Sequence, residues 1–556
     1  MACKLIWTNW KMYWKTIFVI VYPLVLLPVF LLSNTSAYRC LYIVLIMAGY
    51  WVCEALPLAI TALIPMVLFP LMGVLDSDKT SICYFKETNM MFVGGLIIAV
   101  AVEHCNLHRR MALHVIKIVG CSPRKLNIGL ATVTMMVSMW ISNTAATAMM
   151  IPIVEATLME LEAQGVGKMW EPLPEEDAEA APKTAEAKEE EWQKQRKPTN
   201  ATMCYFMSTA YAACIGGNGC IIGSGTNLTL KGIYESRFQD SPGVGFVEWL
   251  FLNVPMMLIM LYLSILWLQV WFMGLFRPKS EDAKSINLGR EGELAAKQVI
   301  HNKLVEMGPM TFHEKAVGFC FILVVLLWFF RKPQLIPGWA EMITDHKVKD
   351  ATAAMIVVFI LFIIPSKPEF IYMFSKNEEK RPKKASEGLI TWKIIQQRIP
   401  WGLVFLLGGG FAVADASKAS GMSKLLGDTL VKVTELPKIY VMMVTCTFAA
   451  FITQFTGSNV AVANVILPVL SEMAVTAKIH PMFLMMPATL SCSFSYCLPV
   501  STPPMAITAD ACNMSSSKMF KCGTGVVIIS LATLFAVFPF LGPLIWNLEE
   551  FPDWAA

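Results

Sequence analysis

Charged residues are scarce in this sequence. Asp, Glu, Lys and Arg make up only 15% of the 556 residues, whereas 56% are hydrophobic and the mean hydropathy is +0.55. A soluble domain carries roughly 25% charged residues, so most of this chain must lie in lipid or against other apolar helices. The formal net charge is only +4 and the basic residues fall in loops, so nothing indicates a nucleic-acid partner.

Motifs for catalysis and for metal binding are also missing. The sequence contains no HExxH, no paired intramembrane aspartates and no nucleophile–base arrangement, and Gly-Ser-Gly at 223–225 is its one nucleophile-like string. The fifteen cysteines are scattered through apolar segments without metal-ligand spacing, so we expect small buried residues. We therefore expect no enzyme, no bound metal centre and no organic cofactor.

Long apolar runs are abundant. A run of about 17 residues can cross a hydrocarbon core of about 30 Å as a helix. Such runs lie at 17–33, 41–75, 248–275, 316–330, 351–365 and 524–546. Lys4, Lys11 and Lys15 precede the first run, which lacks a small-residue cleavage site, so we expect an uncleaved span and a cytoplasmic N-terminus.

The basic loops then predict the topology. The positive-inside rule gives an all-α polytopic membrane protein of about 11 transmembrane helices plus two re-entrant helical hairpins, with an extracellular C-terminus. In order, we expect a cytoplasmic N-terminus (1–16), first spans (17–126), an inner re-entrant hairpin (127–157), a cytoplasmic linker (158–200), a broken helix and the following span (201–275), a cytoplasmic loop (276–313), further spans (314–439) with a cytoplasmic loop (366–400), an outer re-entrant hairpin (440–470), and a broken helix, last span and C-terminus (471–556).

Three elements occur twice in the same order. They are paired glycines followed by Ala-Val-Ala, a Ser-Asn pair followed by small residues, and a helix-breaking segment. The pairs are "FVGGLIIAVAVEH" (92–104) with "FLLGGGFAVADAS" (405–417), "SNTAATAMMIPI" (142–153) with "SNVAVANVILPV" (458–469), and "IGGNGCIIGSGTN" (215–227) with "LPVSTPP" (498–504). Because the predicted topology gives the two copies opposite directions, we expect an inverted repeat, which is typical of secondary transporters.

The polar segments of this repeat indicate what it can bind. Unwound backbone at membrane depth is tolerated only where it lines a cavity or is buried in protein. Its N–H groups, with Ser, Thr and Asn side chains, suit an anion, and its freed carbonyls suit a small cation. Helix–helix hydrogen bonding by small polar residues is the alternative explanation. A channel or a sensor that does not transport has the same composition and remains the alternative class.

Four acidic residues lie at or near the ends of predicted spans. They are Glu54, Glu103, Asp415 and Asp510. Acids at these positions usually lie at the membrane interface or cap helices, and proton coupling is the alternative.

The motifs together resemble the animal sodium/carboxylate cotransporter family, the divalent anion:sodium symporters. The resemblance is carried by "SMWISNTAATAMM", "PWGLVFLLGGGFAVA", "SNVAVANVILPVL" and "LPVSTPP", and "VGCSPRKL" and "FRPKSEDAK" are similar to insect members, the I'm-not-dead-yet group. It implies a plasma-membrane homodimer whose protomers each have a scaffold domain and a moving transport domain (an elevator). The implied substrates are succinate, other dicarboxylates and citrate.

The resemblance also implies site residues. The substrate carboxylates would contact two hairpin tips and the second broken helix: Ser142, Asn143, Thr144, Ser458, Asn459, Val460, Thr502 and Pro503. One sodium site would use Ser138, Ser142, Asn143 and Gly223, with Asn227. A second would use Thr453, Thr456, Gly457 and the Ser458–Asn459 pair, together with Ser501.

The sequence departs from the sodium-coupled pattern in three places. The glycine-rich loop, usually Gly-Thr-x-Pro-Asn, lacks the proline at 223–227. Gln454 occupies the usual threonine position five residues before Asn459 and Thr453 lies one position further back, so the hairpin is one residue longer than expected, with Gly457 before Ser458. Met505 replaces the asparagine of the final "TPPN". Because each change removes or shifts an oxygen or a fixed turn, we expect sodium-independent exchange of di- and tricarboxylates. The alternative is sodium-coupled symport of these anions or, less expected, of sulfate.

Overall fold

The computed structural model describes most of the chain. It covers residues 2–119, 122–163, 169–171, 197–277, 279–280, 297–298, 301–302, 304–331, 337–372, 386–422, 425 and 437–555. The central part of the predicted linker 158–200, and parts of the predicted loops 276–313 and 366–400, lie outside these residues. Every predicted site residue lies within them.

The described chain is almost entirely helical. The helices of the first half are α1 (Ala2–Leu32), α2 (Ser36–Cys53), α3 (Leu58–Thr61), α4 (Ile64–Leu71), α5 (Ser77–Cys83), α6 (Glu87–His104), α7 (Leu107–Val119), α8 (Pro123–Ser138), α9 (Asn143–Ala163), α11 (Asn200–Gly216), η2 (Ile221–Gly223), α12 (Gly225–Arg237) and α13 (Phe246–Phe272). The strands in the described residues, β1 (Trp170–Glu171) and β2 (Lys197–Pro198), pair antiparallel with Trp170 opposite Pro198.

The second half has the same helical character. Its helices are α16 (Phe312–Phe329), α17 (Trp339–Ile343), α18 (Asp350–Ile363), η3 (Pro368–Tyr372), α19 (Trp392–Arg398), α20 (Trp401–Ser420), α22 (Lys438–Ile452), α23 (Asn459–Thr476), α24 (Pro481–Ser491), η6 (Pro499–Ser501), α25 (Pro503–Ala511), α26 (Ser516–Ile545) and η7 (Asp553–Ala555). Helices dominate because in lipid every backbone N–H and C=O must find its partner within the protein.

Nine helical stretches of the described chain are long and apolar enough to cross a membrane. The polytopic helical class is therefore confirmed. The nine include α9 and α23, which the sequence places in re-entrant hairpins, and they leave out the shorter apolar helices α18 and α22. A hairpin limb of 18 or 21 residues is as long as a span. The number of spans, the re-entrant hairpins and the inverted repeat therefore stay predictions.

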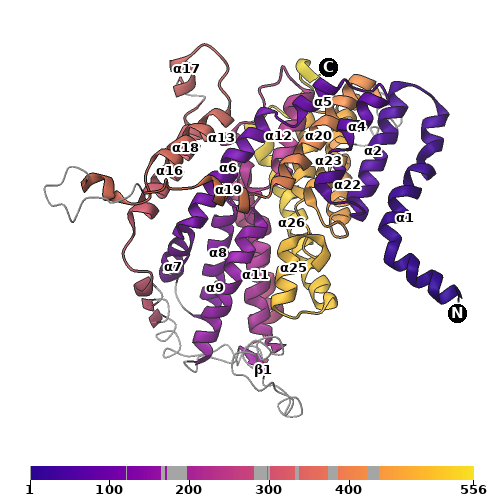
Figure 1. Cartoon of the computed structure of the whole chain (residues 1–556). Coiled ribbons are helices and arrows are strands. Elements are labelled where there is room, and N and C mark those ends of the chain that lie inside the picture. Colours follow the sequence, from indigo (N-terminus) through magenta and orange to yellow (C-terminus); the bar gives the residue numbers. More distant parts are fainter. Residues whose placement is uncertain are drawn as a thin grey trace.

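The core lies around α11. Every residue from Ala201 to Gly216 is buried, because α8, α9, α13 and α25 surround the helix. Figure 1 shows α8, α9 and α11 running side by side, with α7 on one side and α25 on the other. By contrast, α1 lies at the edge of the bundle and packs against α2, and no residue from Met12 to Val29 is fully buried, with Ile20, Leu24 and Val25 exposed. A helix that exposes so many apolar side chains is suited to lipid contact.

Two of the acids expected at span ends form ion pairs. Asp415 lies 2.7 Å from Lys86 Nζ, and Glu103 lies 3.1 Å from Arg398. Both pairs are partly exposed, as expected for residues near the ends of spans.

Candidate functional site

The first Ser-Asn element forms a tight turn between two helices. α8 ends at Ser138 and α9 begins at Asn143. Ser142 Oγ accepts a hydrogen bond from the backbone N–H of Ala145 (3.4 Å), which makes Ser142 the N-cap of α9. The side chains of Ser142 and Asn143 are half-buried and Thr144 is exposed. The tip therefore presents a helix N-terminus with polar side chains.

Acceptor oxygens gather behind this tip. Ser138 Oγ lies 2.6 Å from the carbonyl oxygen of Ala213 and 2.9 Å from Asn143 Oδ1. A serine hydroxyl has one proton, so it can donate to only one of these two acceptors at a time. The other acceptor keeps a lone pair without a donor.

The break between α11 and α12 packs directly against the first tip. A Cβ on Gly217 would lie 2.2 Å from Asn143 Oδ1. A Cβ on Gly223 would lie 2.7 Å from the carbonyl oxygens of both Gly217 and Met139. Only glycine allows this approach, which brings Asn143 Oδ1 and the carbonyl oxygens of Met139 and Gly217 directly against the backbone of the break.

A buried asparagine keeps the break in place. Asn227 Nδ2 donates to the carbonyl oxygens of Gly217 and Cys220, both at 2.8 Å. The carbonyls released by the end of α11 are thereby satisfied within the protein. Ser138, Asn143, Gly223 and Asn227, four of the residues expected at the first cation site, therefore lie around one break. The described residues contain no cluster of His, Cys, Asp and Glu suited to a metal ion, so this set consists of neutral oxygens.

The second Ser-Asn element forms a similar turn. α22 ends at Ile452 and α23 begins at Asn459, with Ser458 Oγ accepting from the N–H of Ala461 (3.3 Å) as the N-cap. Asn459 Oδ1 is buried and has no hydrogen-bond partner in the described chain. Since a buried polar atom without a partner costs about 1–3 kcal/mol, this amide is suited to meet a ligand.

The second tip touches the first break. A Cβ on Gly225, the first residue of α12, would lie 2.6 Å from Val460 Cγ2. Thr226 Oγ1 lies 2.9 Å from Ser493 Oγ, which links the break before α12 to the unwound segment after α24. The helices of the two halves also pack against each other: α23 packs against α12, and α9 packs against α25. Each hairpin thus lies against the broken helix of the other half.

The remaining expected residues lie at the second break or just before the second tip. Thr502 is the N-cap residue of α25, which begins at Pro503, and Thr502 is buried. The hydroxyls of Ser501, Thr453 and Thr456 each donate to a backbone carbonyl of their own segment: Leu498 (2.6 Å), Ala450 (2.9 Å) and Ile452 (3.5 Å) respectively. Each of these hydroxyls donates its proton to the backbone, and its oxygen keeps lone pairs that can meet a ligand.

Sequence reasoning missed the residue that joins the second tip to the second break. It registered Gln454 only as a lost threonine, whereas the structure gives this side chain hydrogen bonds to Phe494, Tyr496 and Cys497. These partners lie 40 to 43 positions along the chain, so no local pattern could have revealed them.

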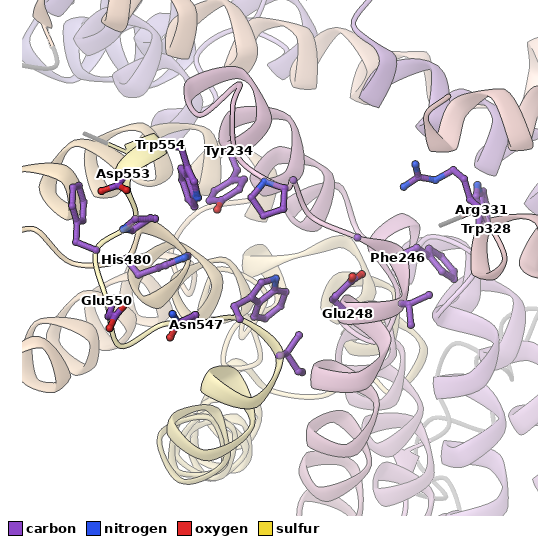
Figure 2. Close-up of a pocket in the computed structure, with 18 residues that line it drawn as sticks. Tyr234, Phe246, Glu248, Trp328, Arg331, His480, Asn547, Glu550, Asp553 and Trp554 are labelled. Carbon is purple, nitrogen blue, oxygen red and sulfur yellow. The ribbon is translucent and has the colours of Figure 1, made fainter. Parts of the chain in front are cut away.

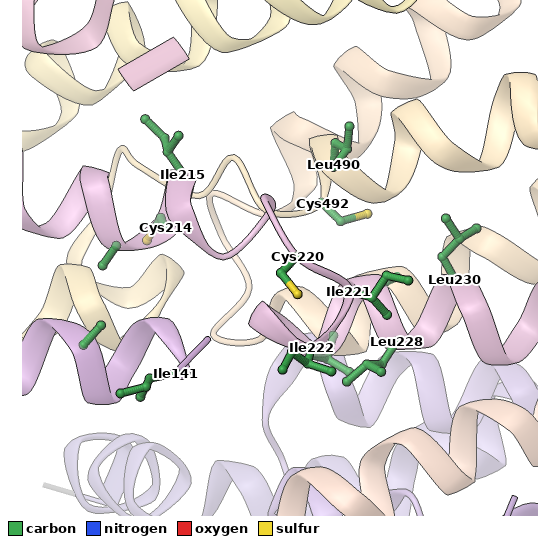
Figure 3. Packing of buried hydrophobic residues seen from close by; sticks show 14 of the residues in the cluster. Ile141, Cys214, Ile215, Cys220, Ile221, Ile222, Leu228, Leu230, Leu490 and Cys492 are labelled. Atoms are coloured by element: carbon green, nitrogen blue, oxygen red, sulfur yellow. The ribbon is translucent and has the colours of Figure 1, made fainter. Parts of the chain in front are cut away.

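Apolar side chains close the space around both breaks. Figure 3 shows Ile215, Cys220 and Ile222 from the first break near Leu490 and Cys492 from the second. All five are buried. They exclude water from the unwound backbone, which strengthens the polar contacts made there. Of the described free cysteines, all except Cys53 are buried, as expected.

Two cavities lie away from the hairpin tips. One, of about 520 Å³, is lined by Tyr234, His480 and Trp554 among others (Figure 2), and burial lowers the pKa of His480 to about 4. The other, of about 660 Å³, includes Lys231 and Asp350. Neither is lined by a residue of either tip. The candidate site at the tips and breaks rests on the hydrogen bonds and close contacts described above.

Alanine at Gly217 tests the close approach behind the first tip. Because the added Cβ would lie 2.2 Å from Asn143 Oδ1, the tip must move away. We expect Gly217→Ala to destabilise the folded protein by about 1–3 kcal/mol, measured as a lower thermal unfolding midpoint in detergent.

Gly402→Ala is the matched control. There the new Cβ would meet Ala59 Cβ at 3.5 Å, an ordinary contact inside α20. Its midpoint should stay the same or rise, since alanine favours helix. Equal midpoints for the two variants would contradict the packing described for the first tip.

Comparison with known proteins identifies the family. Residues 8–547 match the model described as the sodium:sulfate symporter transmembrane region. The protein I'm not dead yet of Drosophila melanogaster is 46% identical over 545 residues, which cover 98% of this chain and 91% of that protein. The Na(+)/citrate cotransporter of Rattus norvegicus is 38% identical, covering 96% of this chain and 95% of that one.

One further sequence relative is equally similar, whereas the match to a solved structure is weak. Solute carrier family 13 member 2 of Homo sapiens is 37% identical, covering 99% of this chain and 96% of that protein. A solved structure of Neisseria gonorrhoeae MtrF superimposes over 83% of this chain and 82% of that one with a TM-score of 0.48 and 14% identity, which is too weak to carry an argument. The sequence relatives confirm the family predicted from the motifs: the chain belongs to the sodium:sulfate symporter family, together with the sodium/carboxylate cotransporters.

Proposed function

We propose that this protein carries di- and tricarboxylates, such as succinate and citrate, across the plasma membrane by sodium-coupled symport. Relatives named Na(+)/citrate cotransporter and Na(+)/dicarboxylate cotransporter 3 cover almost the whole chain. The sodium-independent exchange expected from the sequence is not supported by these relatives, and the sodium-coupled alternative fits them better. The structural observation that carries the proposal is the pair of N-capped tips, each packed on the broken helix of the other half.

The tips can hold a carboxylate without a basic residue. α9 and α23 begin at the two asparagines, so free N–H groups and the positive end of each helix dipole lie at the tips. Asn143 and Asn459 add amide groups whose orientation can place N–H toward a carboxylate oxygen. Two tips suit an anion with two carboxylates. Thr144, Val460, Thr502 and Pro503 would shape the same pocket.

A cation beside the first tip would supply the missing positive charge. No Lys or Arg lies in the tip elements 142–153 and 458–469 or in the breaks 215–227 and 498–504. The oxygens around Gly217 and Gly223 are neutral and suited to replace the hydration shell of a sodium ion. Sodium bound there would favour the anion at the adjacent N-terminus, which couples the two bindings.

The moving body of an elevator would contain both hairpins and both broken helices. The packing of α9 on α25 and of α23 on α12 supports this, because these helices then form one continuous unit. The expected inverted repeat, scaffold and homodimer belong to the same proposal. The cytoplasmic N-terminus and the extracellular C-terminus belong to it too. In Figure 1 the C-terminus lies at the opposite end of the bundle from β1, which is part of the predicted cytoplasmic linker 158–200.

Asparagine removal at either tip tests the site. We expect Asn143→Ala and Asn459→Ala each to lower labelled succinate uptake at least about tenfold, since a hydrogen bond to a charged group contributes about 1.5–3 kcal/mol. Surface expression should be retained. Asn547→Ala, an exposed asparagine at the C-terminal end, is the control. Normal uptake by both tip variants would show that the site is elsewhere.

Replacing sodium with choline tests the coupling. Labelled succinate uptake into proteoliposomes should fall to background in choline and return with sodium. The same assay with unlabelled citrate or sulfate as competitor ranks the substrates, and we expect citrate to compete and sulfate not to. Uptake that persists in choline and rises with succinate inside the vesicles would restore exchange as the function.

A further inference from the structure

The C-terminal half of α12, residues 231–237, contacts helices outside the proposed moving body. That body consists of the two hairpins and the two broken helices, so it includes α12 but not α6, α18 or α20. A Cβ on Gly232 would overlap the ring of Phe411 on α20, which shows that α12 and α20 pack at close range. In the same region, a buried polar cluster and a partly exposed one join α12 to these helices.

The buried cluster lies between α12 and the start of α18. Lys231 Nζ lies 3.2 Å from Asp350 Oδ2, and the two side chains are 4% and 1% exposed. On its own helix, Lys231 Nζ also lies 2.8 Å from Glu235 Oε1. On the other side, Arg331 Nε lies 2.6 Å from Asp350 Oδ1, and Lys349 Nζ lies 3.2 Å from Glu235 Oε2. Charges of both signs therefore face each other across the boundary.

The partly exposed cluster lies between the end of α12 and α20. Ser236 Oγ donates to Asp415 Oδ1 of α20. Lys86, the N-cap residue of α6, donates from Nζ to Ser236 Oγ and to Asp415 Oδ2, both at 2.7 Å. Lys418 Nζ of α20 also donates to the carbonyl oxygen of Arg237 (3.4 Å). The end of α12 is therefore bound to two helices outside the moving body.

The buried and half-buried charges of both clusters keep a partner when α12 moves away. The pairs that would remain are Lys231 with Glu235, Asp350 with Arg331, and Asp415 with Lys86. Ser236 is neutral and Lys349 is 52% exposed, so water can replace what they lose. Breaking a buried ion pair is costly because it usually leaves a charge uncompensated. Here no buried charge is left so, and the contacts can form and break repeatedly.

A neighbouring ion pair ties α12 to the moving body itself. Arg237 Nε lies 2.7 Å from Glu472 Oε1 of α23, and the two side chains are 21% and 8% exposed. Both residues belong to the proposed moving body, so this pair should persist in every position of that body. Adjacent residues of α12, Ser236 and Arg237, thus direct their side chains to partners on opposite sides of the boundary.

We propose that the Lys231–Asp350, Glu235–Lys349 and Ser236–Asp415 contacts form a reversible latch, which holds the moving body in one of its positions and opens in every transport cycle. Contacts that are made in only one of two states bias the equilibrium toward that state. The inference rests on the elevator transport proposed above and identifies contacts that set the balance between its positions.

Cross-linking across the latch tests the proposal. Ser236→Cys with Asp415→Cys, joined by a short bifunctional thiosulfonate reagent, should lower labelled succinate uptake at least about tenfold, because a body fixed in one position cannot complete the cycle. A reductant should restore uptake. Cys83 is changed to serine in this protein because its Sγ lies 3.3 Å from Asp415 Oδ2, and so is Cys53, which is not buried.

Arg237→Cys with Glu472→Cys is the matched control in the same background. The reagent then joins two residues of the moving body, so uptake should be the same before and after cross-linking. Uptake that survives a complete cross-link between positions 236 and 415 would overturn the proposal. Loss of uptake in both cross-linked proteins would also overturn it, because α12 and α23 would then have to separate during transport.

Asp415→Asn tests the latch without any transport. The amide lacks the negative charge that Lys86 contacts, so the moving body should leave the latched position more often. The measurement is the rate of cross-linking between Glu235→Cys and Lys349→Cys in the purified protein without substrate. We expect Asp415→Asn to lower this rate at least about threefold. If Asp415→Asn does not fold, Ser236→Ala, which removes the linking hydroxyl, replaces it.

Glu472→Gln is the control for this rate, since it weakens an ion pair inside the moving body. It should leave the rate unchanged. An unchanged rate in Asp415→Asn, or an equal fall in Glu472→Gln, would contradict the latch. If the unaltered protein takes up no succinate in sodium or in choline, the proposed function fails, whereas this rate still decides the latch. Normal uptake with a rate that does not respond would refute the latch alone.

Discussion

Backbone that leaves a helix inside the membrane must have its N–H and C=O groups satisfied by the protein, and the rest of this structure depends on how that is done. Each half uses one buried carboxamide. Asn227 satisfies the first break from the helix that follows it, whereas Gln454 satisfies the second from the hairpin that precedes it. The backbone groups of the two breaks are therefore satisfied by side chains on opposite sides, after the first break and before the second. The symmetry seen in the sequence motifs does not extend to this contact.

Close approach at glycine explains how the tips and breaks come together. Gly217 meets Asn143 within the first half, and Gly225 meets Val460 of the second. Side chains at these positions would separate the elements and open the unwound backbone to water or lipid. Glycine carries an entropic cost, which is recovered where the backbone must come close to another group. The glycine-rich segment 215–227 therefore interrupts the helix and also allows the two tips to pack closely against it.

The sequence predicted what depends on composition and on local motifs. The helical membrane class follows from apolar run lengths, and the two tips follow from Ser142 and Ser458 as N-caps. It could not separate hairpin limbs from spans, because α9 and α23 are as long as spans. Nor could it place Gln454, which bonds Phe494, Tyr496 and Cys497 at 40 to 43 positions along the chain.

The relatives favour sodium coupling over the exchange expected from the sequence, and the two breaks differ in how the sequence departures are accommodated. The expectation gave equal weight to the departures in the two halves. The proline missing from 223–227 costs the first break little, because Asn227 still holds the carbonyls of Gly217 and Cys220. At the second break Gln454 has the corresponding role, since its Nε2 donates to the carbonyl oxygens of Ala450 and Phe494. The effect of losing a family residue therefore depends on which hydrogen bonds hold the backbone in its place.

A buried group of charged residues lies beside the second cavity. Lys231 on α12 is 3% exposed and lies 3.2 Å from Asp350 at the start of α18, and Arg331 lies 2.6 Å from the same carboxylate. Removing one partner of a buried ion pair leaves a charge uncompensated, which costs about 3–5 kcal/mol. Because α12 begins at the first break, any movement of that break relative to α18 must separate this pair or carry it along. The first break and the charged contact are thus connected by α12, so a displacement of one is transmitted to the other through this helix.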